Sequence, residues 1–157
     1  MMTYSIETNV NGRPRAAEVT ARDTLLDVLR DHWDVFEVKN GCEQGDCGVC
    51  TVILSGKAVN ACLTLAVQAN GKDVVTVKGI GSPKEPHLLQ TKFVEHGAIQ
   101  CGFCTPGMLT SAKVLLDQNP KANRQEIREA IAGNLCRCTG YKKIVDAIEA
   151  AAAKPES

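Results

Sequence analysis

The segment GCEQGDCGVC, residues 41–50, constrains this chain more than any other. It spaces three cysteines as C-x4-C-x2-C, and a fourth cysteine follows after eleven residues. The four are Cys42, Cys47, Cys50 and Cys62. Plant-type [2Fe–2S] clusters are bound with this spacing, and each iron of such a cluster takes two thiolates. We therefore predict an iron–sulfur site with three ligands from one loop and the fourth from the hairpin that follows.

Three glycines, Gly41, Gly45 and Gly48, lie among these cysteines. Glycine accepts a positive φ and lets backbone N–H groups come close to sulfur. Hydrogen bonds of this kind tune the reduction potential of a cluster. A flexible turn would account for the glycines alone, but not for their position among correctly spaced cysteines.

A second set of four cysteines lies in the C-terminal half, within QCGFCTPG and NLCRCTGY. Its members are Cys101, Cys104, Cys136 and Cys138. Zinc is also bound by four thiolates that include C-x2-C pairs, so spacing alone leaves zinc and iron–sulfur open here. The plant-type loop in the same chain favours iron–sulfur. All eight cysteines of the chain are then accounted for as ligands.

Composition narrows the remaining classes of function. The 157 residues are 44% apolar, and 18 basic residues balance 18 acidic ones, so no charge excess favours nucleic acid or an anionic membrane. No apolar run approaches the length of a transmembrane span. The N-terminus lacks an apolar export segment, so we expect a cytoplasmic protein. In that reducing compartment, eight cysteines indicate metal ligation rather than disulfides.

Up to about residue 80, the pattern predicts a mixed β structure with one helix. Alternation predicts a strand over residues 4–10, and Asn11 with Gly12 predicts a hairpin turn. Thr24 and Asp27 form a capping pair before an apolar helical face. The other expected elements are a helix over residues 25–29 and strands over residues 17–19, 51–54, 59–62 and 74–77.

After a linker at residues 78–87, four helices are expected, with apolar faces within residues 88–94, 108–116, 127–131 and 141–152. Asn123 and Glu126 resemble a capping box for the third. A half-repeat runs helix, glycine, two cysteines, threonine, helix. Its glycines are Gly97 and Gly133, and its threonines, Thr105 and Thr139, are the expected N-caps. Two similar hairpins would then face a shared four-cysteine site, where helix dipoles favour an anionic cluster.

The motifs GCEQGDCGVCTVIL, NACLTLA, QCGFCTPGM and AGNLCRCTGY together resemble the small iron–sulfur subunit of the molybdenum hydroxylases. This family includes xanthine dehydrogenase, aldehyde oxidoreductase and carbon monoxide dehydrogenase. The resemblance runs from about Tyr4 to Ala152, with every ligand position matched. It implies an α+β fold. Residues 1–79 would form a β-grasp, ferredoxin-like domain with the first cluster, and residues 80–157 a four-helix domain of approximate two-fold symmetry with the second.

The resemblance also implies the function. Electrons would pass from a molybdopterin site through two [2Fe–2S] clusters to FAD, while a substrate carbon is hydroxylated with oxygen from water. Gln100 and Cys138 occupy the family positions that approach the pterin. The flavin and molybdenum cofactors would belong to a medium and a large subunit, in a heterotrimer or a dimer of heterotrimers. No Ser/His/Asp set, phosphate loop or acid pair predicts catalysis by this chain alone.

Two other hypotheses are weighed against this one. A free-standing two-cluster ferredoxin would need no fixed partner, but a simple plant-type carrier needs only the first half of the chain. A structural zinc protein acting as an interaction module would use the same thiols. The C-x4-C loop and the absence of a basic bias argue against it.

Overall fold

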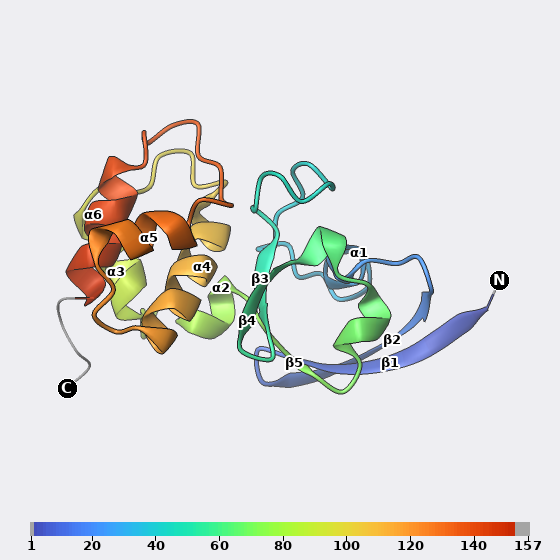
Figure 1. Cartoon of the computed structure of the whole chain (residues 1–157). Coiled ribbons are helices and arrows are strands. Elements are labelled where there is room, and N and C mark those ends of the chain that lie inside the picture. Colours follow the sequence, from blue (N-terminus) through green and yellow to red (C-terminus); the bar gives the residue numbers. More distant parts are fainter. Residues whose placement is uncertain (1, 153–157) are drawn as a thin grey trace.

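The structure, a computed structural model, describes residues 2–152 and consists of a sheet half and a helical half (Figure 1). The strands are β1 Thr3–Val10, β2 Arg13–Thr20, β3 Thr51–Leu54, β4 Lys57–Asn60 and β5 Asp73–Val75. The helices are α1 Leu25–Asp27, α2 Val77–Ile80, α3 Leu88–Glu95, α4 Thr105–Gln118, α5 Arg124–Ala130 and α6 Lys142–Ala152. A fold of class α+β, with a mixed sheet and helices, is confirmed.

The sheet has the order β2-β1-β5-β3-β4, in which β1 and β5 are parallel and the other neighbours are antiparallel. The predicted first hairpin is present: Asn11 and Gly12 have φ of 51° and 78°, the left-handed values that a two-residue turn requires. Along β1, Ile6, Thr8 and Val10 are buried in alternation. Ile6 and Val10 belong to the same apolar core as Leu25 and Leu26 of α1, whose predicted capping box is also present.

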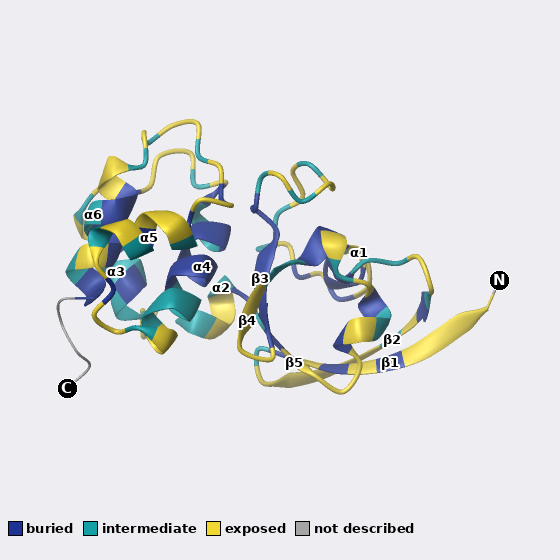
Figure 2. Ribbon diagram, in the orientation of Figure 1, coloured by how far each residue is buried: buried dark blue, intermediate teal, exposed yellow. Residues whose placement is uncertain are grey.

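The helical half has its own apolar core, distinct from that of the sheet half. α3 packs against α6, and α5 against α4 and α6. The predicted capping box of α5 is present, because Asn123 accepts from the N–H groups of Gln125 and Glu126. β3 is buried along its whole length because α4 covers the side turned away from the sheet core (Figure 2).

Two predicted strands are shorter than expected. β4 ends at Asn60, and Cys62 lies instead in a 3-10 turn, Ala61–Leu63, which turns the chain back toward Cys50. β5 ends at Val75 because α2 begins at Val77, so the predicted linker is helical in its first part.

The prediction that Thr105 and Thr139 are N-caps is wrong. Cys104 holds the N-cap position of α4, so Thr105 is already its first residue. Before α6, Gly140 and Tyr141 have φ of 64° and 65°, which delays the helix to Lys142. The hydroxyl of Thr139 therefore accepts from the N–H of Tyr141, within the loop and not at the helix.

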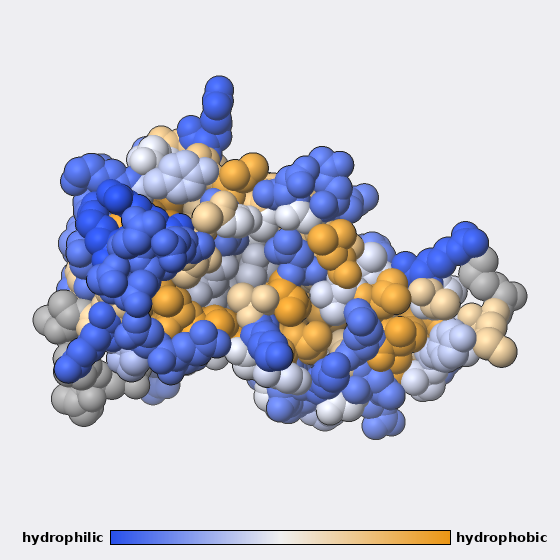
Figure 3. All heavy atoms as spheres, viewed as in Figure 1, coloured by the Kyte–Doolittle hydropathy of each residue, from blue (hydrophilic) through white to orange (hydrophobic). Residues whose placement is uncertain are grey.

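The surface facing the viewer is mainly hydrophilic, with hydrophobic residues in patches between polar ones (Figure 3). Within residues 2–152, no helix combines the length and apolar character that crossing a bilayer requires.

Candidate metal centres

The first quartet is gathered by an irregular loop and the turn after β4. The N–H of Cys47 points at the sulfur of Cys42, with 3.4 Å between nitrogen and Sγ. Backbone N–H groups of Gln44, and then of Cys47, lower the pKa of Cys42 to about 7. Burial, followed by the neighbouring thiol of Cys50, raises the pKa of Cys62 to about 11. The quartet thus consists of two pairs. Cys42 and Cys47 form one, in which backbone N–H groups point at sulfur. Cys50 and Cys62 form the other, which is buried.

Glycine is required in this loop for space as well as for backbone freedom. A Cβ on Gly41 would lie 3.0 Å from the Sγ of Cys47. Gly45 has φ of 85°, and a Cβ there would lie 2.3 Å from Leu63, the residue after Cys62. The glycines therefore let the loop close against its own ligands. The expected positive φ is found at Gly45 and Gly48 but not at Gly41.

The second quartet is formed by the loop before α4 and the loop before α6, which run side by side in Figure 1. Cys101 and Cys138 are exposed, and their sulfurs are 3.5 Å apart. Burial, and then the thiol of Cys136, raises the pKa of Cys104 to about 12. Burial alone would raise the pKa of Cys136, but hydrogen bonds from Thr139 and nearby backbone N–H groups outweigh it and lower the pKa. The four thiols again form two pairs, Cys101 with Cys138 and Cys104 with Cys136.

Pairing distinguishes the two chemistries that spacing left open. All eight cysteines are free thiols. A structural zinc ion needs four ligands around one point, whereas a [2Fe–2S] cluster needs two thiolates at each of two irons. The donor set, its pairing and the N–H groups at Cys42 therefore fit a two-iron cluster.

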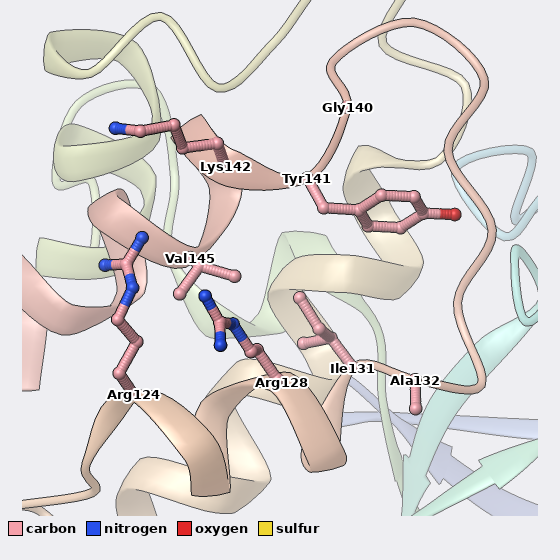
Figure 4. A pocket seen from close by; sticks show the side chains of 8 residues that line it. All are labelled: Arg124, Arg128, Ile131, Ala132, Gly140, Tyr141, Lys142 and Val145. Carbon is pink, nitrogen blue, oxygen red and sulfur yellow. The ribbon is translucent and has the colours of Figure 1, made fainter.

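Tyr141 supports the second quartet in a way that the sequence did not predict. Its hydroxyl oxygen accepts a hydrogen bond from the N–H of Cys136 at 2.8 Å. Tyr141 also borders a hollow between α5 and α6, and its hydroxyl points away from the arginines there (Figure 4). In that hollow, Arg124 is already paired with Asp146 and Glu149, each at 2.6 Å. The hollow contains no cysteine, and we assign it no ligand.

Gln100, the predicted pterin contact, is exposed, and no hydrogen bond joins its side chain to the rest of residues 2–152. Its neighbour Cys101 and the other predicted contact, Cys138, are exposed beside it. Apolar side chains of Phe103 and Leu135 are also exposed in these loops. One side of the second quartet is therefore open to a partner molecule.

The two quartets are connected through the backbone. The N–H of Leu135 donates to the carbonyl of Cys47 at 2.9 Å, and Leu135 directly precedes Cys136. Asn134, which the sequence placed in a motif but gave no role, is buried beside this contact. Its partners are 23 to 86 residues away, a separation that no local pattern reveals.

Comparisons with known proteins find two iron–sulfur families in this chain. Residues 8–73 match the family described as 2Fe-2S iron-sulfur cluster binding domain, and residues 76–149 the family described as [2Fe-2S] binding domain. The chain is 47% identical over 148 residues to the nicotinate dehydrogenase small FeS subunit of Eubacterium barkeri, covering 94% of each. It is 49% identical over 143 residues to the nicotine 6-hydroxylase small subunit of Paenarthrobacter nicotinovorans, covering 91% of this chain and 86% of that one.

Solved structures show the same likeness. A chain of quinoline 2-oxidoreductase from Pseudomonas putida 86 superposes with a TM-score of 0.91 at 46% identity, covering 97% of this chain and 94% of that one. Aldehyde oxidoreductase from Desulfovibrio gigas gives a TM-score of 0.91 at 46% identity. The match covers 96% of this chain but 17% of the aldehyde oxidoreductase chain, so there the equivalent unit belongs to a much longer polypeptide.

Proposed function

This chain belongs to the small iron–sulfur subunits of the molybdenum hydroxylases, and from that membership we propose which of its residues bind the two [2Fe–2S] clusters. Cys42, Cys47, Cys50 and Cys62 bind the first. Cys101, Cys104, Cys136 and Cys138 bind the second. The observation that carries this assignment is the pairing of thiols in both quartets, with the two sulfurs of Cys101 and Cys138 3.5 Å apart. When bound, each cluster supplies reversible one-electron chemistry.

The protein's own contribution is to supply the thiolates and to stabilise negative charge on some of them. Backbone N–H groups at Cys42 stabilise negative charge on its sulfur. Cys104 stands at the N-terminal end of α4, where the helix dipole opposes the burial that raises the pKa of this thiol. The chain is therefore the electron-transfer subunit of an oxidoreductase complex, and substrate chemistry belongs to other subunits.

We propose domain limits of 1–79 and 80–157, with a β-grasp, ferredoxin-like first domain and a four-helix second domain of approximate two-fold symmetry. The matched families meet between residues 73 and 76, which supports a limit near that point. The parallel pairing of β1 with β5 supports the β-grasp topology. The repeated order of helix, cysteine pair and helix around α3–α4 and α5–α6 supports the symmetry.

The proposed partners are a large molybdopterin-binding subunit and a medium FAD-binding subunit, in a heterotrimer or its dimer. The relatives are small subunits by name, which favours a bound subunit over a free-standing ferredoxin. We propose that the exposed Gln100 and Cys138 face the pterin and that the first quartet lies toward the flavin. Eight free thiols support a reducing, cytoplasmic location.

The deciding experiment is low-temperature EPR of the dithionite-reduced chain, with iron and acid-labile sulfide counted on the same sample. Two clusters predict two distinct signals and about four irons per chain. A colourless protein that contains zinc and gives no signal would overturn the assignment. Co-purification with two larger chains separates the subunit from a free carrier.

The ligand assignment has its own test. Cys104→Ser should remove one signal and reduce the iron content to about two per chain, because a [2Fe–2S] cluster contains two irons. Cys62→Ser should remove the other signal and leave the first. If both variants lost the same signal, the division into two quartets would be wrong.

A further inference from the structure

Asn134 forms a fully buried polar contact between the two halves of the molecule. The residue is 4% exposed. Its amide donates to the carbonyl of Gly48 at 2.9 Å and to the hydroxyl of Thr51 at 3.2 Å. Its carbonyl oxygen accepts from the hydroxyl of Ser111 at 2.7 Å. We call Gly48, Thr51, Ser111 and Asn134 the Asn134 junction.

The backbones at this junction are in very close contact. A Cβ on Gly48 would lie 2.2 Å from the carbonyl oxygen of Gly133. A Cβ on Gly107, in the first turn of α4, would lie 2.4 Å from the carbonyl oxygen of Gly48. Two glycines thus allow the loop of the first quartet to touch both α4 and the turn that leads to the second quartet.

The junction lies beside the hydrogen bond that connects the quartets. Gly48 follows Cys47, whose carbonyl accepts from the N–H of Leu135 at 2.9 Å. Leu135 follows Asn134 and precedes Cys136. One side chain therefore holds the residue next to a ligand of the first quartet and itself lies two residues from a ligand of the second.

We propose that Asn134 is a positioning residue that sets the separation and contact of the two clusters for electron exchange between them. This inference rests on the proposed function, in which both quartets bind clusters. The exchange moves one electron from a reduced to an oxidised cluster, and no bond or proton changes. The protein contributes distance and intervening contacts, and a buried, fully satisfied polar network fixes one arrangement where apolar packing would allow several.

The junction differs from a second polar contact, which joins the turn between β1 and β2 to the residue after β5. Asn11 donates to the hydroxyl of Thr76 at 2.8 Å and accepts from the N–H of Thr76 at 2.8 Å. Thr76 follows β5, and neither residue contacts a cysteine loop in the hydrogen bonds of the described chain. Because Asn11 has a positive φ, glycine is the replacement that removes its side chain without adding backbone strain. Asn11→Gly is therefore a matched control.

The test compares Asn134→Ala, the milder Ser111→Ala and the control Asn11→Gly with the wild type, each as the cluster-loaded full chain. Two quantities are measured: the splitting of the EPR signals caused by magnetic interaction of the two reduced clusters, and the rate of electron equilibration between them after flash reduction. Melting temperature is recorded in parallel. A wild type without two cluster signals would reject the proposed function itself, before any variant is compared.

We expect Asn134→Ala to weaken and broaden the splitting and to slow equilibration several-fold. Ser111→Ala should change both in the same direction by less. Asn11→Gly should lower the melting temperature and leave both unchanged. The inference is overturned if Asn134→Ala and Ser111→Ala lower the melting temperature but keep the wild-type splitting and rate. If Asn134→Ala fails to bind clusters, Ser111→Ala alone decides between these outcomes.

Discussion

Tyr141 combines a left-handed backbone, with φ of 65°, and a side chain that folds back to the N–H of Cys136. A non-glycine residue with this φ is uncommon and persists where surrounding contacts hold it. The hydrogen bond to Cys136 is such a contact. It also satisfies a partly buried donor in the loop that carries two proposed ligands.

Tyr141→Phe should therefore destabilise the protein by about 1 kcal/mol, because the N–H of Cys136 loses its acceptor. The free energy of unfolding in denaturant measures this loss. The control is Tyr4→Phe, since Tyr4 is exposed and, among residues 2–152, its hydroxyl bonds only to the sulfur of Met2. Equal stability of both variants would contradict a supporting role for Tyr141.

At this scale the sequence predicted the thiol sets but not their support. The spacing of the cysteines predicted the first quartet directly. The contact of Tyr141 depends on two consecutive left-handed residues, Gly140 and Tyr141, and the pattern pointed instead to a helix capped by Thr139. Backbone handedness at a tyrosine is set by tertiary contacts, so propensity could not reveal it.

Among the elements, the loop between Gly41 and β3 contains two glycines with positive φ, Gly45 and Gly48. Gly48 has φ of 67°, and a side chain there would also collide with Gly133. Gly71 has φ of 71°, but a Cβ at that position meets nothing within 4 Å. The two glycines share a backbone requirement and differ in the space around them.

Gly48→Ala should therefore destabilise the protein clearly more than Gly71→Ala, which bears only the backbone strain of about 1 kcal/mol. The additional loss of stability in Gly48→Ala comes from the displaced contact between this loop and the turn at Gly133. Melting temperature and iron content of the two purified variants measure it, and we expect iron loss only in Gly48→Ala. Similar melting temperatures and iron contents for both variants would contradict this prediction, because they would mean that the loop can move away from Gly133 without loss of stability.

The starts of helices were predictable where a capping box marks them, whereas the ends of strands next to Cys62 and after β5 were not. The capping boxes at Thr24 and Asn123 have local signals, and both are present. Cys62 was expected in a strand but lies in a 3-10 turn. Cys62 must lie next to the other three cysteines of the first quartet, and this determines its position. Alternation of apolar residues is a local pattern and cannot predict such a contact.

The whole molecule has two apolar cores, and the loop of the first quartet contributes to both. Cys50 packs in the sheet core, whereas Val49, one residue earlier, packs in the helical core. The sequence predicted two halves joined by a linker, and nothing in it indicated that this loop is shared. Contacts such as Asn134 to Gly48, 86 residues apart, join the halves through protein groups.

Removal of iron should consequently loosen the cysteine loops without separating the halves. Thiolates that lose their metal keep only a few protein contacts, whereas the two cores and the Asn134 junction are satisfied by protein groups alone. Amide hydrogen exchange of the cluster-loaded and iron-stripped chain measures the difference. We expect faster exchange within residues 42–46 and 99–104, but slow exchange throughout at Leu135, whose N–H is bonded to Cys47, and along β1 and α4. Loss of protection across both cores would instead mean that the clusters are required for the fold, and fast exchange at Leu135 alone would mean that the junction forms only around bound metal.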